Sequence, residues 1–192
     1  MRRKAMDNEV AKIFRKILRD IKVDLTDQFD KNFENESFFG EGWERRKSPV
    51  RGDGHILVSS GALRRSISSR SDDTSITFYS SLPYAAIHNE GGEIRVTQRM
   101  KSFFWHKYYE AVGGFGRKKD GNLRNDKKNK RLSTEAEFYK AMALMKVGST
   151  VKIPRRRFLG TSPQLEEGVK KIIEDNLTQY FETAITSKLK KQ

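Results

Sequence analysis

Two long stripes of apolar residues, one near each end of the chain, limit the possible folds more than any other feature of the sequence. The first stripe recurs at spacings of three and four residues, which predicts a helix from about residue 6 to 33. At 1.5 Å per residue such a helix is about 40 Å long, more than a small sheet needs. The stripe therefore either packs into the core across the whole domain or reaches a neighbouring subunit. Its members are Val10, Ile13, Phe14, Ile17, Leu18, Ile21, Leu25, Phe29 and Phe33.

The second stripe follows Thr161-Ser162-Pro163, a pattern that supplies a helix cap and a proline for the first turn. Lysines at the end of the chain suit a helix C-terminus. The prediction is a long terminal helix that buries one face. The residues expected on that face are Leu165, Val169, Ile172, Ile173, Leu177, Tyr180, Phe181, Ile185 and Leu189.

Short strands are predicted between the two helices. Residues 67–70 and 75–80 read as an antiparallel hairpin around Asp72-Asp73, and residues 93–96 and 151–153 read as further strands. Before the hairpin, Ser59 or Ser60 is expected to cap a brief helical turn that buries Leu63 and Ile67. The predicted class is α+β, a small antiparallel sheet packed by long N- and C-terminal helices. We expect a single domain over residues 1–192, with an insertion at 106–148.

An aromatic segment over residues 100–109 is interpreted as an aromatic-rich strand. Aromatic side chains interleaved with cations can stack on nucleic-acid bases, but they are equally typical of protein interfaces. We favour an oligomer interface, because no known RNA-binding signature is present. The interface residues are expected to be Phe103, Phe104, Trp105, Tyr108 and Tyr109.

The positive charge of the chain is concentrated in one segment. The formal net charge is +14, and residues 99–131 hold eleven Lys and Arg against three Asp and Glu. Such a run indicates either a solvated face or an anionic partner such as nucleic acid. Residues 113–131 are expected to form a mobile loop, followed by a short helix from Ser133 that contains Phe138, Met142 and Met145. The candidate nucleic-acid contacts are Arg117, Lys118, Lys119, Lys127 and Lys128.

No motif in the sequence predicts catalysis, a metal site or a cofactor. The chain has no cysteine, which fits synthesis in a reducing cytoplasm, and its three histidines lie far apart. His88 is expected to hydrogen-bond the following glycine turn, and Glu90 and Glu93 lack the features of an acid-base couple. No signal peptide and no membrane span are expected, because no window holds about 18 consecutive apolar residues.

Three short motifs, in order, resemble the phage virion morphogenesis family, which includes the tail-completion proteins of Mu-like and P2-like phages. They are residues 60–67, 84–92 and 153–160, each weak alone and more specific as an ordered trio. The long basic interval over residues 106–148 and the long first helix depart from the family pattern. The residues that carry the resemblance are Gly61, Leu63, Tyr84, His88, Gly91, Gly92, Pro154, Arg157, Phe158 and Gly160.

The resemblance implies a non-enzymatic virion protein, assembled in the bacterial host cytoplasm. It implies a ring, often a hexamer, at the head-proximal end of the tail, where it acts in tail completion or head-tail joining. The expected partners are further copies of the chain and the tail-tube or head-connector proteins, and DNA is a further candidate. The alternative function is a basic nucleic-acid-binding protein that uses residues 99–131.

Overall fold

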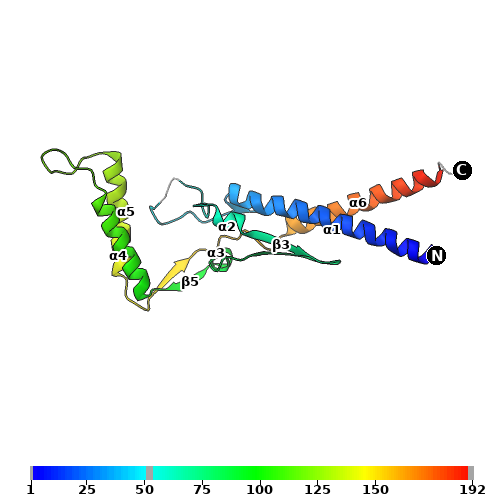
Figure 1. Cartoon of the computed structure of the whole chain (residues 1–192), viewed down its shortest axis with the longest axis horizontal. Coiled ribbons are helices and arrows are strands. Elements are labelled where there is room, and N and C mark those ends of the chain that lie inside the picture. Colours follow the sequence, from blue (N-terminus) through cyan, green and yellow to red (C-terminus); the bar gives the residue numbers. More distant parts are fainter. Residues whose placement is uncertain (1, 51–53, 190–192) are drawn as a thin grey trace. The chain divides into compact units, whose positions relative to one another are not determined.

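The computed structural model describes residues 2–50 and 54–189, and Figure 1 shows their helices and strands. The predicted α+β class is confirmed: long helices begin and end the chain, and short antiparallel strands lie between them. In the part of the chain that is described, the strands form three separate two-stranded sheets. Two compact units can be distinguished, and each is described by itself. One comprises Met1–Trp43, His55–Asn89 and Arg156–Gln192, and the other comprises Glu44–Gly54 and Glu90–Arg155.

The first unit is built around two long helices that run antiparallel. Its elements are α1 (Arg2–Glu34), β1 (Ser37–Phe38), β2 (Glu41–Gly42), α2 (Ala62–Arg65), β3 (Ile67–Ser71), β4 (Ile76–Ser80), α3 (Ala85–Glu90, apart from its last residue) and α6 (Pro163–Leu189). Figure 1 shows α1 and α6 alongside each other, with both termini at one end. Both helices were predicted at nearly these bounds, because each carries a long stripe of helical period.

Local signals explain where several elements begin and turn. Ser162 caps α6 by accepting a hydrogen bond from the Leu165 N–H at 3.1 Å, with Pro163 at the first helical position, as predicted. The Asp72 side chain closes the β3–β4 hairpin by accepting bonds from Thr74 and Ser75, and these bonds lower the pKa of Asp72 to about 2. The predicted cap of the helical turn α2 is present in part, because the Ser60 hydroxyl accepts a hydrogen bond from the N–H of Ala62, the first residue of α2, at 3.3 Å. Gly61 occupies its N-cap position in the left-handed conformation, with no side-chain cap.

The core of the first unit lies in two adjoining clusters. One follows the middle of α1, where α6 and the β3–β4 hairpin pack against Ile17, Ile21, Leu25 and Phe29. The other lies at the C-terminal end of α1 and consists of Phe33, Trp43, Ile56, Leu63, Ala85 and Phe158. Burial of an aromatic side chain stabilises a fold by about 2–3 kcal/mol. The cluster along the middle of α1 therefore holds the two long helices together, whereas the cluster around Phe33 joins the C-terminal end of α1 to the segments that carry Trp43, Leu63 and Phe158.

The apolar stripes are not buried over their whole length. The exposed fraction is 57% for Phe14 on α1 and 59% for both Phe181 and Ile185 on α6. The prediction that the second stripe is buried to its end is therefore wrong for Leu177, Phe181, Ile185 and Leu189. The physical reason is that the described first unit gives the helices little cover there: Asp73 and Thr74 of the hairpin turn lie beside Val10 and Phe14, yet both of these side chains remain exposed.

The second unit is a two-stranded ribbon that carries a helical hairpin. Strands β5 (Gly92–Arg95) and β6 (Thr150–Ile153) pair antiparallel, and α4 (Gln98–Gly113) and α5 (Lys127–Leu144) lie between them in the sequence. Helices α4 and α5 pack through small residues, since Ala111, Ala136 and Ala143 are buried. The ribbon itself has little cover, because all four residues of β5 are exposed.

Two predictions for the second unit are wrong. The aromatic segment lies on the helix α4 and not on a strand, because a continuous helix from Thr97 overrides the local strand propensity of its aromatic residues. Helix α5 begins at Lys127 rather than near Ser133, because Asp126 caps it by accepting a bond from the Asn129 N–H. The segment before it, which the sequence predicts to be a mobile loop, makes defined hydrogen bonds.

Candidate functional site

The second and third motifs are joined by one amide side chain. The Asn89 Oδ1 accepts hydrogen bonds from the backbone N–H groups of Phe158 and Leu159, both at 2.9 Å, and its Nδ2 donates to the Leu159 carbonyl at 3.1 Å. The Arg156 N–H adds a bond to the His88 carbonyl at 2.8 Å. An Asn side chain can accept two bonds and donate two, so Asn89 satisfies a stretch of backbone that has no strand partner.

Helix α1 and Trp43 hold the same backbone from the other side. Asn32 donates to the Phe158 carbonyl at 3.3 Å, and the Trp43 indole N–H donates to the Arg157 carbonyl at 2.7 Å. The Phe33 ring contacts the rings of Phe158 and Trp43, with centroid distances of 5.1 and 5.7 Å. Phe33 and Phe158 are essentially fully buried, with exposed fractions of 0% and 1%. The third motif is therefore a buried loop whose polar backbone is well satisfied.

The first motif contributes two adjacent residues, Leu63 and Arg64, with different contacts. Leu63 lies in the same apolar cluster as Phe158 and Ala85, so all three motifs meet in one core. We name this region, defined by Leu63, Asn89 and Phe158, the motif junction. The neighbouring Arg64 lies outside the cluster and binds helix α1.

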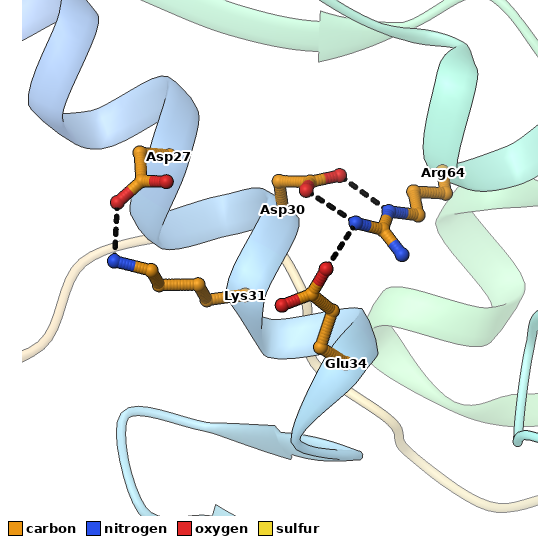
Figure 2. A network of polar contacts seen from close by, with 5 residues as sticks. All are labelled: Asp27, Asp30, Lys31, Glu34 and Arg64. Carbon is orange, nitrogen blue, oxygen red and sulfur yellow. Dashed lines mark hydrogen bonds and ion pairs between the residues drawn. The ribbon is translucent and has the colours of Figure 1, made fainter.

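Arg64 forms the polar connection between α2 and α1, as Figure 2 shows. Its guanidinium donates from Nε and Nη2 to both carboxylate oxygens of Asp30, and from Nη2 to Glu34 at 2.7 Å. The hydrogen bond from Arg64 lowers the pKa of Asp30, and Asp30 in turn raises the pKa of Arg64. Lys31 pairs with Asp27 one turn away on α1 (Figure 2). The bidentate geometry fixes the orientation of α2.

Two of the predicted glycines are required by close approach. Gly91 has a φ of 73°, and a Cβ placed there would lie 2.9 Å from the Arg155 backbone nitrogen. Gly160 has a φ of 138°, and a Cβ there would lie 2.3 Å from the Arg157 guanidinium. Gly91 therefore excludes other residues on conformational and steric grounds, because backbone atoms of Arg155 lie in the way, whereas Gly160 excludes them on conformational grounds, since the Arg157 side chain can move. The Arg157 side chain lies over the Phe38 ring, 4.5 Å from its centroid.

The predicted role of His88 is wrong. Its Nδ1 is buried without a hydrogen-bond partner in the described chain, and the ring packs edge-on against Tyr84. Burial, followed by the positive charge of Arg156, lowers the pKa of His88. The imidazole is therefore held in its neutral form and does not bond the glycine turn through Nδ1.

The described surroundings of the motif junction consist of structural contacts. Glu90 and Glu93 are both exposed. A cavity of about 200 Å³ beside Asn89 is lined mainly by apolar side chains, including Leu82, Ala85 and Leu159. In the described ranges, no cluster of three or more His, Asp or Glu side chains could hold a metal ion. None of the helices over those ranges is long and apolar enough to cross a membrane.

The aromatic residues predicted as an interface are divided by the structure. Phe104 faces α5, with ring centroids 6.4 Å from both Phe138 and Tyr139. Trp105 stacks on Tyr109 at 5.9 Å and meets Tyr108 edge-on. The outer surface of α4 is formed by Phe103 and Tyr109, which are both exposed.

A second candidate surface lies at the end of the α1–α6 pair. The sequence left open burial or a neighbouring subunit for the α1 stripe and predicted burial for the α6 stripe. Polar contacts between the helices join the Lys16 ammonium to Asn176 at 2.7 Å and to Gln179 at 2.9 Å. Beyond them, toward the termini, large apolar side chains are exposed on both helices. We name this surface the open end, and its residues are Val10, Phe14, Phe181, Ile185 and Leu189.

Sequence reasoning missed Asn89 and Arg64. It left open that the first stripe reaches a neighbouring subunit, but it did not predict that the end of the second stripe is exposed. Asn89 lies inside the second motif, between His88 and the glycine pair, but its spacing predicts no partner 70 residues away. Arg64 had a weak signal, because Asp30 and Glu34 present two carboxylates on one helical face.

The sequence model of the phage virion morphogenesis family matches residues 3–178. No curated protein and no solved structure matches the chain.

Proposed function

The chain belongs to the phage virion morphogenesis family, and on that premise we propose that it forms a ring at the head-proximal end of a phage tail. Membership of the family gives the chain a structural role in a virion. The proposal adds that this role is non-enzymatic, that it is exercised in tail completion or head-tail joining, and that the subunits assemble in the host cytoplasm.

The observation that carries the ring is the open end of the α1–α6 pair. At this end of the two packed helices, large apolar side chains are exposed to water in the isolated chain. Contiguous exposed apolar surface is typical of a protein interface. A ring of identical subunits would cover that surface on every copy, and closed symmetry would limit the number of copies.

The short sheets support the same proposal. A two-stranded ribbon is marginally stable alone, and its unpaired strand edges can pair with another chain. The β5–β6 ribbon and the β3–β4 hairpin both have two strands. Neighbouring subunits, or the tail-tube and head-connector proteins, would complete them in the assembled particle.

Particles made without the protein provide the direct test. A phage or prophage whose copy of the gene is deleted should produce heads and tails that fail to join, or tails of irregular end structure, in electron micrographs. The unmodified chain supplied from a plasmid should restore joined particles. Intact, joined and infectious particles in its absence would refute the proposal.

A complementation series tests the surface that carries the proposal. The double variant Phe181→Glu, Ile185→Glu should fail to restore joined particles while it accumulates at the normal level. The matched control Leu144→Glu, Val147→Glu places the same charges on exposed apolar residues of the second unit. Restoration by the open-end variant would show that this surface is not an assembly interface.

A further inference from the structure

The tip of the α4–α5 hairpin carries five lysines that have no acidic partner among the residues that the structure describes. We name this group the basic tip, and its members are Lys118, Lys119, Lys127, Lys128 and Lys130. All five side chains are exposed, and none is ion-paired with a carboxylate within the described ranges. Arg117 and Arg124 lie in the same loop and donate to backbone carbonyls.

The loop that presents these lysines is well supported. Asn129 is buried and makes three hydrogen bonds to it, accepting from the Gly116 N–H and donating to the carbonyls of Gly116 and Arg124, at 2.7–2.8 Å. Arg117 and Leu123 form an antiparallel bridge, and the Lys118 N–H donates to the Asn122 carbonyl at 2.8 Å. The charges are therefore held on a defined scaffold and not on a structureless tail.

The two acidic residues of the loop act on the local backbone. Asp120 accepts from the Asn122 N–H at 3.0 Å, and Asp126 caps α5 by accepting from the Asn129 N–H at 2.8 Å. The first turn of α5 has no acidic residue and contains lysines instead. Cations at a helix N-terminus oppose the helix dipole, and the Asp126 carboxylate that caps α5 is the one anion of the loop at this N-terminus, so the lysines there are only partly compensated.

From these observations we infer that the basic tip binds the phosphate backbone of double-stranded DNA. Phosphate contacts need cations and no apolar anchor, whereas protein interfaces are centred on buried aromatic or aliphatic side chains. Residues 116–131 include one large apolar side chain, Leu123, and no aromatic ring. Single-stranded nucleic acid is bound largely by stacking on aromatic rings, which these residues lack, so the duplex is the better fit.

This inference is independent of the ring, because it concerns the isolated chain. It also differs from the alternative function drawn from the sequence, in which residues 99–131, including the aromatic residues 103–109, bind nucleic acid. In the structure those residues lie on α4 outside the loop, and Phe104 is engaged by α5. The affinity for duplex DNA is therefore expected to come from the lysines of the loop and of the first turns of α5.

The test measures binding of the full chain to a fluorescent DNA duplex by anisotropy, over a salt range of about 50 to 200 mM. Each phosphate contact contributes about 0.9 to the slope of log K against log salt. Substitution of all five lysines by glutamine should reduce that slope by about four and weaken binding at low salt by on the order of 100-fold. Glutamine has a helix propensity close to that of lysine, and the loss of cations relieves the dipole, so the variant should fold.

The matched control removes the same charge elsewhere. Lys47, Lys146, Lys152, Lys170 and Lys171 are exposed lysines outside the loop, and their substitution by glutamine should leave the salt slope within about one of the unmodified chain. A third variant, with arginine at the five tip positions, should bind the duplex as the unmodified chain does.

Three results would overturn the inference. The first is an equal loss of affinity in the tip and control variants, which would indicate diffuse attraction by net charge. The second is absence of duplex binding by the unmodified chain at low salt, or tighter binding of single-stranded DNA. The third is tip-dependent binding of poly-glutamate with no tip-dependent binding of DNA, which would identify an acidic protein surface as the partner.

Discussion

The two ends of the α1–α6 pair are built from the same two helices and the same apolar spacing, yet they differ completely in packing. At the motif junction, Phe33 and Phe158 are buried and the backbone between Arg156 and Leu159 is hydrogen-bonded by side chains from three directions. At the open end, Phe14 and Phe181 are exposed. The difference shows that the stripe of each helix serves folding over one part of its length and is available for assembly over the rest.

The first prediction concerns the centre of the motif junction. Phe158→Ala should lower the free energy of unfolding by about 4 kcal/mol, because it leaves a cavity among Phe33, Trp43 and Leu63. Urea denaturation followed by circular dichroism measures the change. The control Phe181→Ala at the open end should cost less than about 0.5 kcal/mol. Similar losses in the free energy of unfolding for the two variants would contradict the difference in packing between the motif junction and the open end.

The second prediction concerns the hydrogen bonds of Asn89. Asn89→Ala should lower the free energy of unfolding by about 2–3 kcal/mol, because the N–H groups of Phe158 and Leu159 lose their acceptor. Asn89→Asp keeps an acceptor oxygen and should cost less than the alanine variant in the same urea experiment. An equal cost for both substitutions would show that the acceptor is not what stabilises this loop.

The third prediction concerns the ion pairs of Arg64. Arg64→Met should lower the free energy of unfolding at pH 7 by about 1 kcal/mol, because the pairs with Asp30 and Glu34 are partly exposed. The pKa of Asp30 is lowered in the folded state, so this contribution is complete above the unfolded value of about 3.9 and is lost as the pH falls through the folded pKa.

The pH dependence separates the ion pair from simple packing. The difference in stability between the Arg64→Met variant and the unmodified chain should therefore shrink from pH 7 to pH 3. Arg65→Met is the control, because that exposed side chain donates to the Ser60 carbonyl and reaches no carboxylate in the described chain. A difference that does not change with pH would contradict the assignment.

The fourth prediction concerns His88. Its pKa is lowered in the folded state, so the unfolded chain takes up a proton first as the pH falls below about 6.5. The contribution of neutral His88 to the free energy of unfolding should be complete above that value and should decrease toward pH 5. The decrease should be less than about 1 kcal/mol, because solvent screens a half-buried group. His88→Gln should remove this decrease, whereas His106→Gln on exposed α4 should retain it. Denaturation midpoints at pH 7 and pH 5 provide the measurement.

The fifth prediction concerns the open end and has the smallest expected effect on stability. It tests most directly whether the open end differs from the motif junction. Phe181→Glu with Ile185→Glu should change the free energy of unfolding by no more than about 0.5 kcal/mol, because both side chains are already in water. The same variant should reduce self-association in light scattering of concentrated protein, and Leu144→Glu with Val147→Glu should not. A large loss of stability would place the open end in the core.

Elements governed by local chemistry were predictable from the sequence. The apolar period of 3.6 residues located α1 and α6, Asp72 marked the hairpin turn, and Ser162-Pro163 marked the start of α6. The aromatic segment was misassigned because aromatic residues favour strands, while Thr97 and the packing against α5 favour a helix. Three ordered motifs were enough to predict the family, although Asn89, the residue that joins two of them, was not singled out.

The sequence by itself determined where the long helices begin, which face of each is apolar, where the hairpin turns, and where positive charge accumulates. These properties depend on residues within a few positions of one another, so they can be predicted from the local spacing of residue types. The tertiary structure alone decided that Asn89 binds a loop 70 residues away, that His88 is left with an unpartnered nitrogen, and that the stripes leave the core toward the termini. Burial and hydrogen bonding at these positions depend on contacts with elements that are distant in the sequence. The local periodicity of the chain carries no information about those contacts.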